Sequence, residues 1–502
     1  LEPGVRVVHH QVVRGPRGDI GRQRTCVVIA YGQVRRSRRT HVQTRSCVHQ
    51  GQTDLERGGC TGPPGGRHHH RSRHRRGTGA GREGVVHIVT VGREARKAGV
   101  TTPVVGVTVV QAVGASFRHP FFEGDPLEGA LEDICASAFN FPVPLVTPDP
   151  ARPGLRALEL FHGPTGAFKD FGTRFLMGAL DRMARPGERF TVLVATSGDT
   201  GGAAGCAAES RENVALAILY PEGRVSAFQE HQLTCWTGSV AAFSVKGDFD
   251  SCQGLVKAAF ADAALSRRFN LSSANSINIA RLLPQMVYLA AAALDVTKAS
   301  GVAPGFIIPT GNLGHALAAL YARAIGVPIG PVVVATNANA ALSRWAATGL
   351  YQPQPSVATL ANAMDIGAPN NFERLAALEP GARAVTVERV LDEAIRARIS
   401  EDFTRSGYVW CPHSAIGAES WHRLPEAARE QRVWITAATA HPYKFADIVE
   451  PLTGRPVIPS PALEAVLKRP AARRALEPDL PSLSRALTAH FPPLATHHGV
   501  PA

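Results

Sequence analysis

The sequence predicts an α/β protein with two lobes of parallel sheet flanked by helices. This prediction rests on a length of 502 residues, a hydrophobic content of 44%, and short apolar runs that alternate with turns and helical patterns. The length allows more than one ordinary domain, and the apolar content allows a sizeable core. Strands that alternate with helices form parallel sheets with helices on both faces.

The first strand, turn and helix are expected between residues 190 and 209. The β-rich run 190–196 is followed by the turn 197–202, Ser-Gly-Asp-Thr-Gly-Gly, and the alanine-rich pattern 203–209 predicts a helix. The next apolar run, 215–220, predicts the strand that follows.

The same order returns in the second half of the chain. The run 305–309 predicts a strand, 310–314 a turn, 315–323 a helix and 330–336 another strand, while 433–437 predicts a third strand that leads into a loop through Thr439. Ligands bind at the carboxyl ends of the strands in such sheets, where both glycine turns fall.

Four segments are expected along the chain. One lobe covers residues 116–300, beginning with a helix over 127–139, and the other covers 301–460. A mostly helical extension follows at 461–502. An atypical segment, residues 1–115, precedes the lobes.

Residues 1–115 have a composition that does not form a core. They contain 19 Arg and nine His, but no Phe or Trp and only two Leu. A basic arm for nucleic acid, a His/Cys metal-binding tract and sequence never selected for folding are three hypotheses. We favour the third, a disordered or mistranslated segment, because this composition is typical of a GC-rich gene read in a wrong frame or from an extended start.

The net charge of +13 is confined to this segment, which carries 20 basic and 6 acidic residues against 34 and 35 in the remainder. The neutral body argues against nucleic acid as a partner. The mean hydropathy of −0.04 argues against a membrane protein, as does the lack of a run of about 18 apolar residues. The cysteines show no C-x-x-C spacing, so we expect neither a metal site nor disulfides. Without a signal-peptide pattern, we expect a cytoplasmic protein.

Lys169 is the first side chain that suggests chemistry. It lies between Phe168 and Phe171 in a segment rich in Gly and Pro. Partial desolvation by such neighbours lowers the pKa of an ammonium group, which favours Schiff-base chemistry. A solvated surface lysine is the commoner alternative when this residue is considered alone.

Two turns and one threonine offer groups for a bound anion or ring. The turn 311–314 follows a strand and opens a helix, so its N–H groups form a cradle suited to a phosphate. The turn 197–200 would suit a substrate carboxylate, and Thr439 could present a hydroxyl to a pyridine nitrogen. The alternative in each case is an ordinary turn or cap.

Six motifs in order resemble those of the threonine synthase family. The segment Gly163-Pro-Thr-Gly-Ala-Phe-Lys-Asp-Phe-Gly172 is similar to the family's cofactor-lysine motif. The other motifs are Ala195-Thr-Ser-Gly-Asp-Thr-Gly201, Ser276-Ile-Asn-Ile-Ala-Arg281 with Leu283-Pro-Gln285, Pro309-Thr-Gly-Asn-Leu-Gly314, Met364-Asp-Ile366 with Asn371-Phe-Glu-Arg374, and Ala438-Thr-Ala-His-Pro442. The resemblance extends from about residue 117 to about residue 461.

The resemblance implies a fold type II enzyme that binds pyridoxal 5′-phosphate in the cleft between its lobes, with Lys169 as the catalytic residue and covalent anchor. The implied cofactor-binding residues are Lys169, Gly311, Asn312, Leu313, Gly314 and Thr439. The implied substrate-binding residues are Ser197, Gly198, Asp199 and Thr200 for an α-carboxylate, and Ser276, Asn278, Arg281 and His413 for a phosphate.

By the same resemblance, the chain would be a lyase of threonine biosynthesis. It would convert O-phospho-L-homoserine and water into L-threonine and phosphate by γ-elimination and β-addition, with Lys169 moving protons between substrate carbons. The alternatives are a related pyridoxal-phosphate lyase or dehydratase, and a catalytically impaired protein of this fold. The sequence does not indicate an oligomeric state.

Three features depart from the family pattern. Gly166 stands where a bulkier apolar residue is common, and His315 stands where an acidic residue often follows the phosphate turn. Neither change removes a catalytic group. The family's ordered N-terminal domain has no recognisable counterpart in residues 1–115, which implies incomplete packing beside the cleft.

Overall fold

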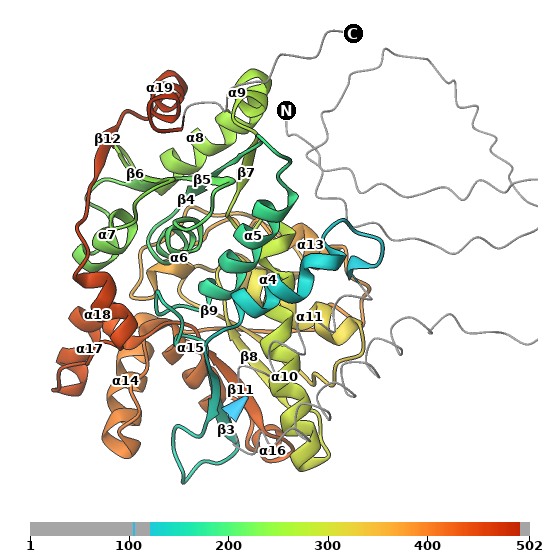
Figure 1. Cartoon of the computed structure of the whole chain (residues 1–502). Coiled ribbons are helices and arrows are strands. Elements are labelled where there is room, and N and C mark those ends of the chain that lie inside the picture. Colours follow the sequence, from blue (N-terminus) through green and yellow to red (C-terminus); the bar gives the residue numbers. More distant parts are fainter. Residues whose placement is uncertain (1–103, 106–120, 492–502) are drawn as a thin grey trace, which may run out of the picture. The chain divides into compact units, whose positions relative to one another are not determined.

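The computed structural model describes residues 104–105 and 121–491, which form two sheets covered by helices (Figure 1). The predicted α/β class with parallel sheets is confirmed. The strands and helices expected around the two glycine turns also form, within two residues of the predicted bounds at most ends.

The five-stranded sheet has the strand order β12-β6-β5-β4-β7, and all its neighbouring strands are parallel. Figure 1 shows it in the upper half of the view. Its strands are β4 (Phe190–Ala195), β5 (Val214–Pro221), β6 (Val240–Val245), β7 (Leu271–Ser273) and β12 (Arg474–Leu476).

The seven-stranded sheet has the order β1-β2-β3-β11-β8-β9-β10. It is parallel from β3 to β10, whereas β1 and β2 extend one edge in antiparallel pairing that the sequence did not indicate. Its strands are β1 (Val104–Val105), β2 (Val143–Val146), β3 (Leu155–Glu159), β8 (Gly305–Pro309), β9 (Val332–Thr336), β10 (Thr386–Arg389) and β11 (Trp434–Ala438).

The two lobes expected at residues 116–300 and 301–460 do not coincide with the two sheets. β2 and β3, from the first range, belong to the sheet formed mainly by the second. β12, from the extension expected to be helical, pairs with β6 of the other sheet. Strand pairing joins segments far apart in sequence, so a single boundary at residue 300 cannot separate the sheets.

The atypical segment 1–115 lies outside the described residues except for Val104–Val105. These two residues form β1 and pair with Pro144 and Val143 of β2. The expectation of a disordered or mistranslated segment concerns residues that otherwise lie outside the described part of the chain, and it stays a prediction.

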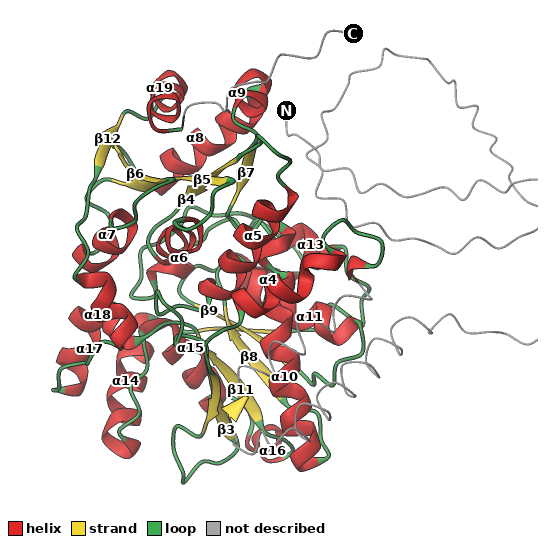
Figure 2. Ribbon diagram, viewed as in Figure 1, coloured by secondary structure: helices red, strands yellow, loops and turns green. Residues whose placement is uncertain are grey.

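Helices pack on both faces of the sheets (Figure 2), as the apolar strands require. In β8, Phe306 and Ile308 face a core shared with α4, α5, α10 and α11, whereas Ile307 faces a core shared with α14, α15 and α17. Helices α8 and α19 cover one face of the five-stranded sheet. These helices are α4 (Leu131–Ala138), α5 (Lys169–Met183), α8 (Phe249–Ala261), α10 (Leu283–Ser300), α11 (Gly314–Ala324), α14 (Asp392–Ser406), α15 (Pro412–His422), α17 (Ala446–Thr453) and α19 (Leu480–His490).

The remaining helices are short or lie at the connections between these layers. The longer ones are α6 (Asp199–Ala208), α7 (Ala227–Thr234), α9 (Ala263–Arg268), α12 (Ala341–Thr348), α13 (Phe372–Ala376), α16 (Glu426–Glu430) and α18 (Pro461–Leu467). The 3-10 turns are η1 (Glu128–Ala130), η2 (Ile279–Arg281), η3 (Asn362–Met364) and η4 (Pro442–Phe445).

Helix α10 and the turn before it, Ile279–Ser300, are long and apolar enough to cross a membrane, although the sequence was expected to contain no such run. However, 78% of its most apolar window is buried inside the protein. The apolar surface of α10 is therefore used in the core shared with α5 and α11.

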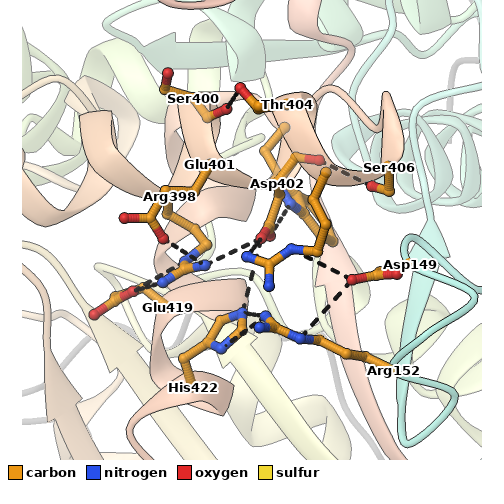
Figure 3. A network of polar contacts seen from close by, with 12 residues as sticks. Asp149, Arg152, Arg398, Ser400, Glu401, Asp402, Thr404, Ser406, Glu419 and His422 are labelled. Atoms are coloured by element: carbon orange, nitrogen blue, oxygen red, sulfur yellow. Dashed lines mark hydrogen bonds and ion pairs between the residues drawn. The ribbon is translucent and has the colours of Figure 1, made fainter.

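A buried polar network joins α14 to α15 (Figure 3). The Arg398 guanidinium lies 3.0 Å from Asp402 Oδ1 and 2.9 Å from Glu419 Oε2. Trp410 Nε1 donates a 2.9 Å hydrogen bond to Asp402 Oδ2. Burial by itself would raise the pKa of Asp402, but a hydrogen bond from His422 and the charge of Arg398 lower it to about 2.

We expect Asp402→Ala to lower the free energy of unfolding by about 3 kcal/mol, because it leaves the buried Arg398 charge and the Trp410 N–H without this partner. Urea unfolding at pH 7 measures the change. Asp133→Ala, which breaks an exposed pair with Arg182, is the control and should cost at most about 1 kcal/mol. Equal losses in the two variants would contradict the prediction.

The lowered pKa of Asp402 also predicts that the stability of the chain depends on pH. The pKa of Asp402 is lower in the folded chain than in the unfolded chain, so its contribution is complete above roughly pH 4 and is lost as the pH falls towards 2. The difference in unfolding free energy between wild type and Asp402→Ala should shrink over this range.

Candidate active site

Lys169 is the first residue of α5 and follows a tightly held turn. Asp170 accepts hydrogen bonds from Thr165, from the backbone N–H at 3.0 Å and from the hydroxyl at 2.6 Å. Phe168 N donates to Thr439 O at 2.9 Å, and His441 N donates to Gly166 O at 2.9 Å. These bonds place the start of α5 beside the loop that follows β11.

The backbone conformation at position 166 favours glycine. Its φ is +66°, and a Cβ there would lie 3.1 Å from Leu463 Cδ1. A residue with a side chain would be strained in this backbone.

The Lys169 side chain is mostly buried, and its amine lies near charged groups. Its side chain is 15% exposed, and Nζ lies 3.8 Å from Asp199 Oδ2. Burial lowers the pKa of Lys169 to about 8; Asp199 opposes this shift, and Lys444 and Arg281 add to it. At neutral pH a useful fraction of the amine is thus unprotonated and can attack a carbonyl carbon.

Asp199 is the first residue of α6 and is shared between two lysines. Its Oδ1 lies 2.8 Å from Lys444 Nζ, on the side away from the Lys169 contact. Burial would raise the pKa of Asp199, but the charges of Lys444 and Lys169 outweigh it and hold this pKa well below its usual range. Its carboxylate is therefore ionised and would repel a substrate carboxylate.

The loop 197–200 remains suited to an anion through other groups. Thr196 Oγ1 accepts hydrogen bonds from Gly198 N at 3.0 Å and from Gly201 N at 3.1 Å, which fixes the loop at the end of β4. The first N–H groups of α6 have no partner within the helix. The geometry thus favours Ser197 and Thr200 over the Asp199 side chain as carboxylate ligands, whereas Gly198 shapes the loop because its N–H is already bonded to Thr196.

The turn 311–314 joins β8 to α11 as predicted, with Leu313 in the left-handed region at φ +63°. A Cβ on Gly311 would lie 2.6 Å from Met364 O, so only glycine fits. Asn371 Nδ2 donates to Asn312 O at 2.9 Å, and Asn370 N donates to Asn312 Oδ1 at 2.6 Å. The turn is held from outside, and its own N–H groups and the start of α11 can face an anion.

One ring contact joins the phosphate turn to the lysine. The His315 imidazole, directly after the turn, stacks on the Phe168 ring with 4.7 Å between centroids and 10° between planes. Burial lowers the pKa of His315 to about 3, so it is neutral, and its Nε2 lies 3.1 Å from the Tyr288 hydroxyl. A neutral imidazole can therefore pack against the Phe168 ring at this position.

Of the residues expected at the substrate phosphate, Ser276 lies beside the turn 311–314, whereas Asn278 and Arg281 bond to their own segment. Ser276 Oγ accepts from Asn312 and Asn371, both at 3.1 Å, so it lies beside the phosphate turn. Asn278 caps η2 by accepting a hydrogen bond from Ala280 N, and its Nδ2 donates to Ser273 O. Both ends of this amide are therefore already bonded within the protein. The Arg281 guanidinium is 3% exposed and bonds Ala274 O.

His413 lies at the start of α15, and one of its two ring nitrogens can donate a hydrogen bond to a ligand. Its Nε2 accepts from Ala363 N at 3.1 Å, so the ring proton lies on Nδ1. Among residues 121–491, that buried Nδ1 has no hydrogen-bond partner. Burial lowers the pKa of His413 to about 4. The next residue, Ser414, accepts a 3.0 Å bond from Thr439 N, so α15 also positions the predicted ring-nitrogen ligand.

Sequence reasoning missed two parts of this site. One is Lys444, which lies between Tyr443 and Phe445 and thus carries the same signal, a lysine among aromatic residues, that singled out Lys169. The other is Asp365, which accepts hydrogen bonds from Thr359, Asn337 and Asn339 and so holds the neighbouring Met364 against Gly311. Its motif was recognised, but only the fold shows this role.

These groups fit pyridoxal phosphate on chemical grounds. Lys169 offers an amine of lowered pKa for an aldehyde, and the turn 311–314 offers N–H groups and a helix start for a phosphate. Residues at the mouth of this turn, Thr310, Gly311, Thr336, Asn337, Met364 and Pro369, line a small pocket at the carboxyl ends of β8 and β9.

Several known proteins are similar to this chain in sequence and in fold. A family model described as pyridoxal-phosphate dependent enzyme matches residues 152–438, and one described as threonine synthase, C-terminal, matches 414–486. The chain is 39% identical to the threonine synthase of Serratia marcescens over 376 residues, which cover 72% of this chain and 81% of the relative.

Two solved structures extend the comparison. The crystal structure of threonine synthase with bound pyridoxal phosphate from Brucella melitensis matches with a TM-score of 0.70 and 32% identity, covering 80% of this chain and 91% of that one. The threonine synthase of Escherichia coli matches with a TM-score of 0.68 and 32% identity, covering 80% and 96%.

Proposed function

The chain belongs to the threonine synthase family of pyridoxal-phosphate-dependent enzymes, and from this premise we propose that its substrate is O-phospho-L-homoserine, with Lys169 as the catalytic residue. The chain has threonine synthase function, is a lyase, and uses pyridoxal phosphate as its cofactor. The proposed reaction converts O-phospho-L-homoserine and water into L-threonine and phosphate. Cytoplasmic location stays a prediction.

One observation carries the assignment of residues. A buried lysine amine, a helix start after a glycine turn, and a neutral histidine with a free N–H come from α5, α11 and α15 and gather around the carboxyl ends of the strands. An amino acid that carries a phosphate needs such a set, because its two anions and its reacting carbons must be held apart.

Pyridoxal phosphate supplies, when bound, an electron-withdrawing ring that stabilises negative charge on a substrate carbon. Lys169, Gly311, Asn312, Leu313, Gly314 and Thr439 are the residues proposed to hold it. The backbone N–H groups of Ser197 and Thr200 would bind the substrate α-carboxylate, Gly198 would shape the loop that presents them, and the start of α6 would favour that negative charge.

The Lys169 amine then acts as a mobile base. It takes a proton from Cα of the substrate, assists loss of a proton from Cβ, and returns a proton at Cγ after phosphate has left. Ser276, Arg281 and the Nδ1–H of His413 would bind the substrate phosphate and stabilise it as it leaves. Water then adds its oxygen at Cβ and releases a proton, and the return of a proton to Cα by Lys169 completes L-threonine.

Product analysis of the purified chain tests the proposal. With pyridoxal phosphate and O-phospho-L-homoserine, we expect L-threonine and inorganic phosphate in equal amounts. Formation of 2-oxobutanoate instead, from either phosphohomoserine or threonine, would assign a dehydratase and contradict the proposal.

We expect His413→Ala to raise KM for O-phospho-L-homoserine about tenfold or more, because it removes a donor to a charged phosphate worth roughly 1.5 to 3 kcal/mol. Steady-state kinetics at pH 7.5 measure the change. His413→Asn, whose amide nitrogen can take the place of Nδ1, should retain more of the affinity, and His490→Ala in the exposed end of α19 should change nothing. An unchanged KM in His413→Ala would remove this residue from the phosphate site.

A further inference from the structure

Lys444 in η4 is a second buried lysine beside the site, and the reaction as proposed does not use it. Its side chain is fully buried. Its Nζ donates to Thr165 O at 2.9 Å and to Gln232 Oε1 at 2.7 Å, and lies 2.8 Å from Asp199 Oδ1. Two of these neighbours accept hydrogen bonds from the ammonium group, and the third, Asp199, is paired with it by charge.

The three neighbours come from three different parts of the site. Thr165 belongs to the turn that precedes Lys169, Asp199 opens α6, and Gln232 lies in α7 and itself donates to Thr165 O at 3.0 Å. The Lys444 ammonium therefore links the lysine turn to the anion-binding loop. A buried link of this kind fixes distances that a flexible loop would not hold.

The charges around the Lys169 amine come from every neighbouring element. Asp199 in α6 is the nearest anion, and Asp170 in α5 bonds Thr165. The cations are Lys444 in η4 and Arg281 in η2, and His413 in α15 is neutral. Asp199 is thus the only carboxylate among the described residues that forms an ion pair with Lys169, and Lys444 takes its other oxygen.

We propose that Lys444 is a positioning residue that holds the Asp199 carboxylate 3.8 Å from the Lys169 amine and prevents this long ion pair from closing to hydrogen-bond distance. A carboxylate with no other cation would move onto the lysine and favour its protonated form. Held by Lys444, Asp199 keeps Lys169 oriented without trapping its proton. The amine can then be both unprotonated, to attack an aldehyde, and protonated, to return a proton to the substrate.

The test measures the titration of Lys169 in the full chain freed of cofactor. The rate at which Lys169 reacts with acetic anhydride, followed at that residue by mass spectrometry over pH 6 to 10, should have its midpoint near pH 8 in the wild type. In Lys444→Met we expect this midpoint to rise by about one unit or more, so that capture of added pyridoxal phosphate at pH 7 slows about tenfold. Lys246→Met, which removes an exposed lysine paired with Glu477, is the matched control and should leave both readings unchanged.

Two further variants separate charge from folding. Lys444→Arg keeps the cation and should leave the midpoint close to that of wild type. Asp199→Asn keeps Lys444 but removes the anion, and should lower the midpoint of Lys169. If Lys444→Met does not fold, as judged by its circular dichroism, the Asp199→Asn result decides.

An unchanged or lowered midpoint in folded Lys444→Met, or an unchanged midpoint in Asp199→Asn, would overturn the inference. It rests on the proposed function in that Lys169 is taken as the cofactor lysine. Acetylation reports on the Lys169 amine with no cofactor present, whereas the Lys169→Ala experiment below tests the cofactor assignment. The proposed role of Lys444 and the assignment of Lys169 as the cofactor lysine can therefore be refuted independently of each other.

Discussion

Lys169→Ala is expected to abolish the formation of L-threonine, with a fall in kcat of about 10⁴-fold or more. The change removes both the covalent anchor of the cofactor and the base that moves protons between substrate carbons, and general acid-base catalysis by itself supplies about 10² to 10⁴-fold. The assay is coupled detection of phosphate and threonine at saturating pyridoxal phosphate. Circular dichroism should show a folded chain, because the Lys169 amine forms an ion pair with Asp199 at 3.8 Å, and Lys444 holds that carboxylate independently.

A second reading of this variant does not depend on turnover. Wild type should gain a visible absorbance band when pyridoxal phosphate is added, and reduction by borohydride should attach the cofactor to the peptide that contains Lys169. Lys169→Ala should show neither, and Lys246→Ala should show both. A band of unchanged position and intensity in Lys169→Ala would refute the assignment of this lysine.

Gly311→Ala is expected to weaken the affinity for pyridoxal phosphate about a hundredfold. The new Cβ would lie 2.6 Å from Met364 O and 2.7 Å from Met364 Cα, both backbone atoms. Met364 cannot yield easily, because its neighbour Asp365 is fixed by Thr359, Asn337 and Asn339. Forced overpacking of this kind costs about 3 kcal/mol, and about 1.4 kcal/mol corresponds to a tenfold change in affinity.

Equilibrium titration of the cofactor-free chain, followed by cofactor absorbance, measures this loss. Gly254→Ala in α8 is the matched control, because a Cβ there meets nothing within 4 Å. It should leave the affinity unchanged and slightly stabilise the helix. A change of less than about threefold in Gly311→Ala would show that the turn 311–314 does not hold the cofactor phosphate.

The strands and turns that carry the candidate site could be predicted from the sequence, because each of them is specified by adjacent residues. The runs that became β4, β8 and β11 are short and apolar, and the turns after β4 and β8 contain the glycines that a tight turn into a helix requires. The order of the motifs, with Lys169 first and Thr439 last, then indicated one family. None of these steps needed to know which strands are neighbours.

The division into lobes failed for the opposite reason. β3 pairs with β11 across more than half of the chain, and β12 returns from the C-terminal extension to pair with β6. The patterns of these strands are compatible with either sheet. Only burial of both sheet faces by helices selects the pairing, and that is a property of the complete fold.

The roles of the charged residues were likewise decided in three dimensions. By sequence, Asp199 looked like part of a carboxylate-binding turn; in the fold it is a buried anion between Lys169 and Lys444. The sequence by itself determined the α/β class, the positions of the lysine and the two turns, and the family. The tertiary structure decided which charges face each other, because the pKa of a buried group depends on neighbours that lie far away along the chain.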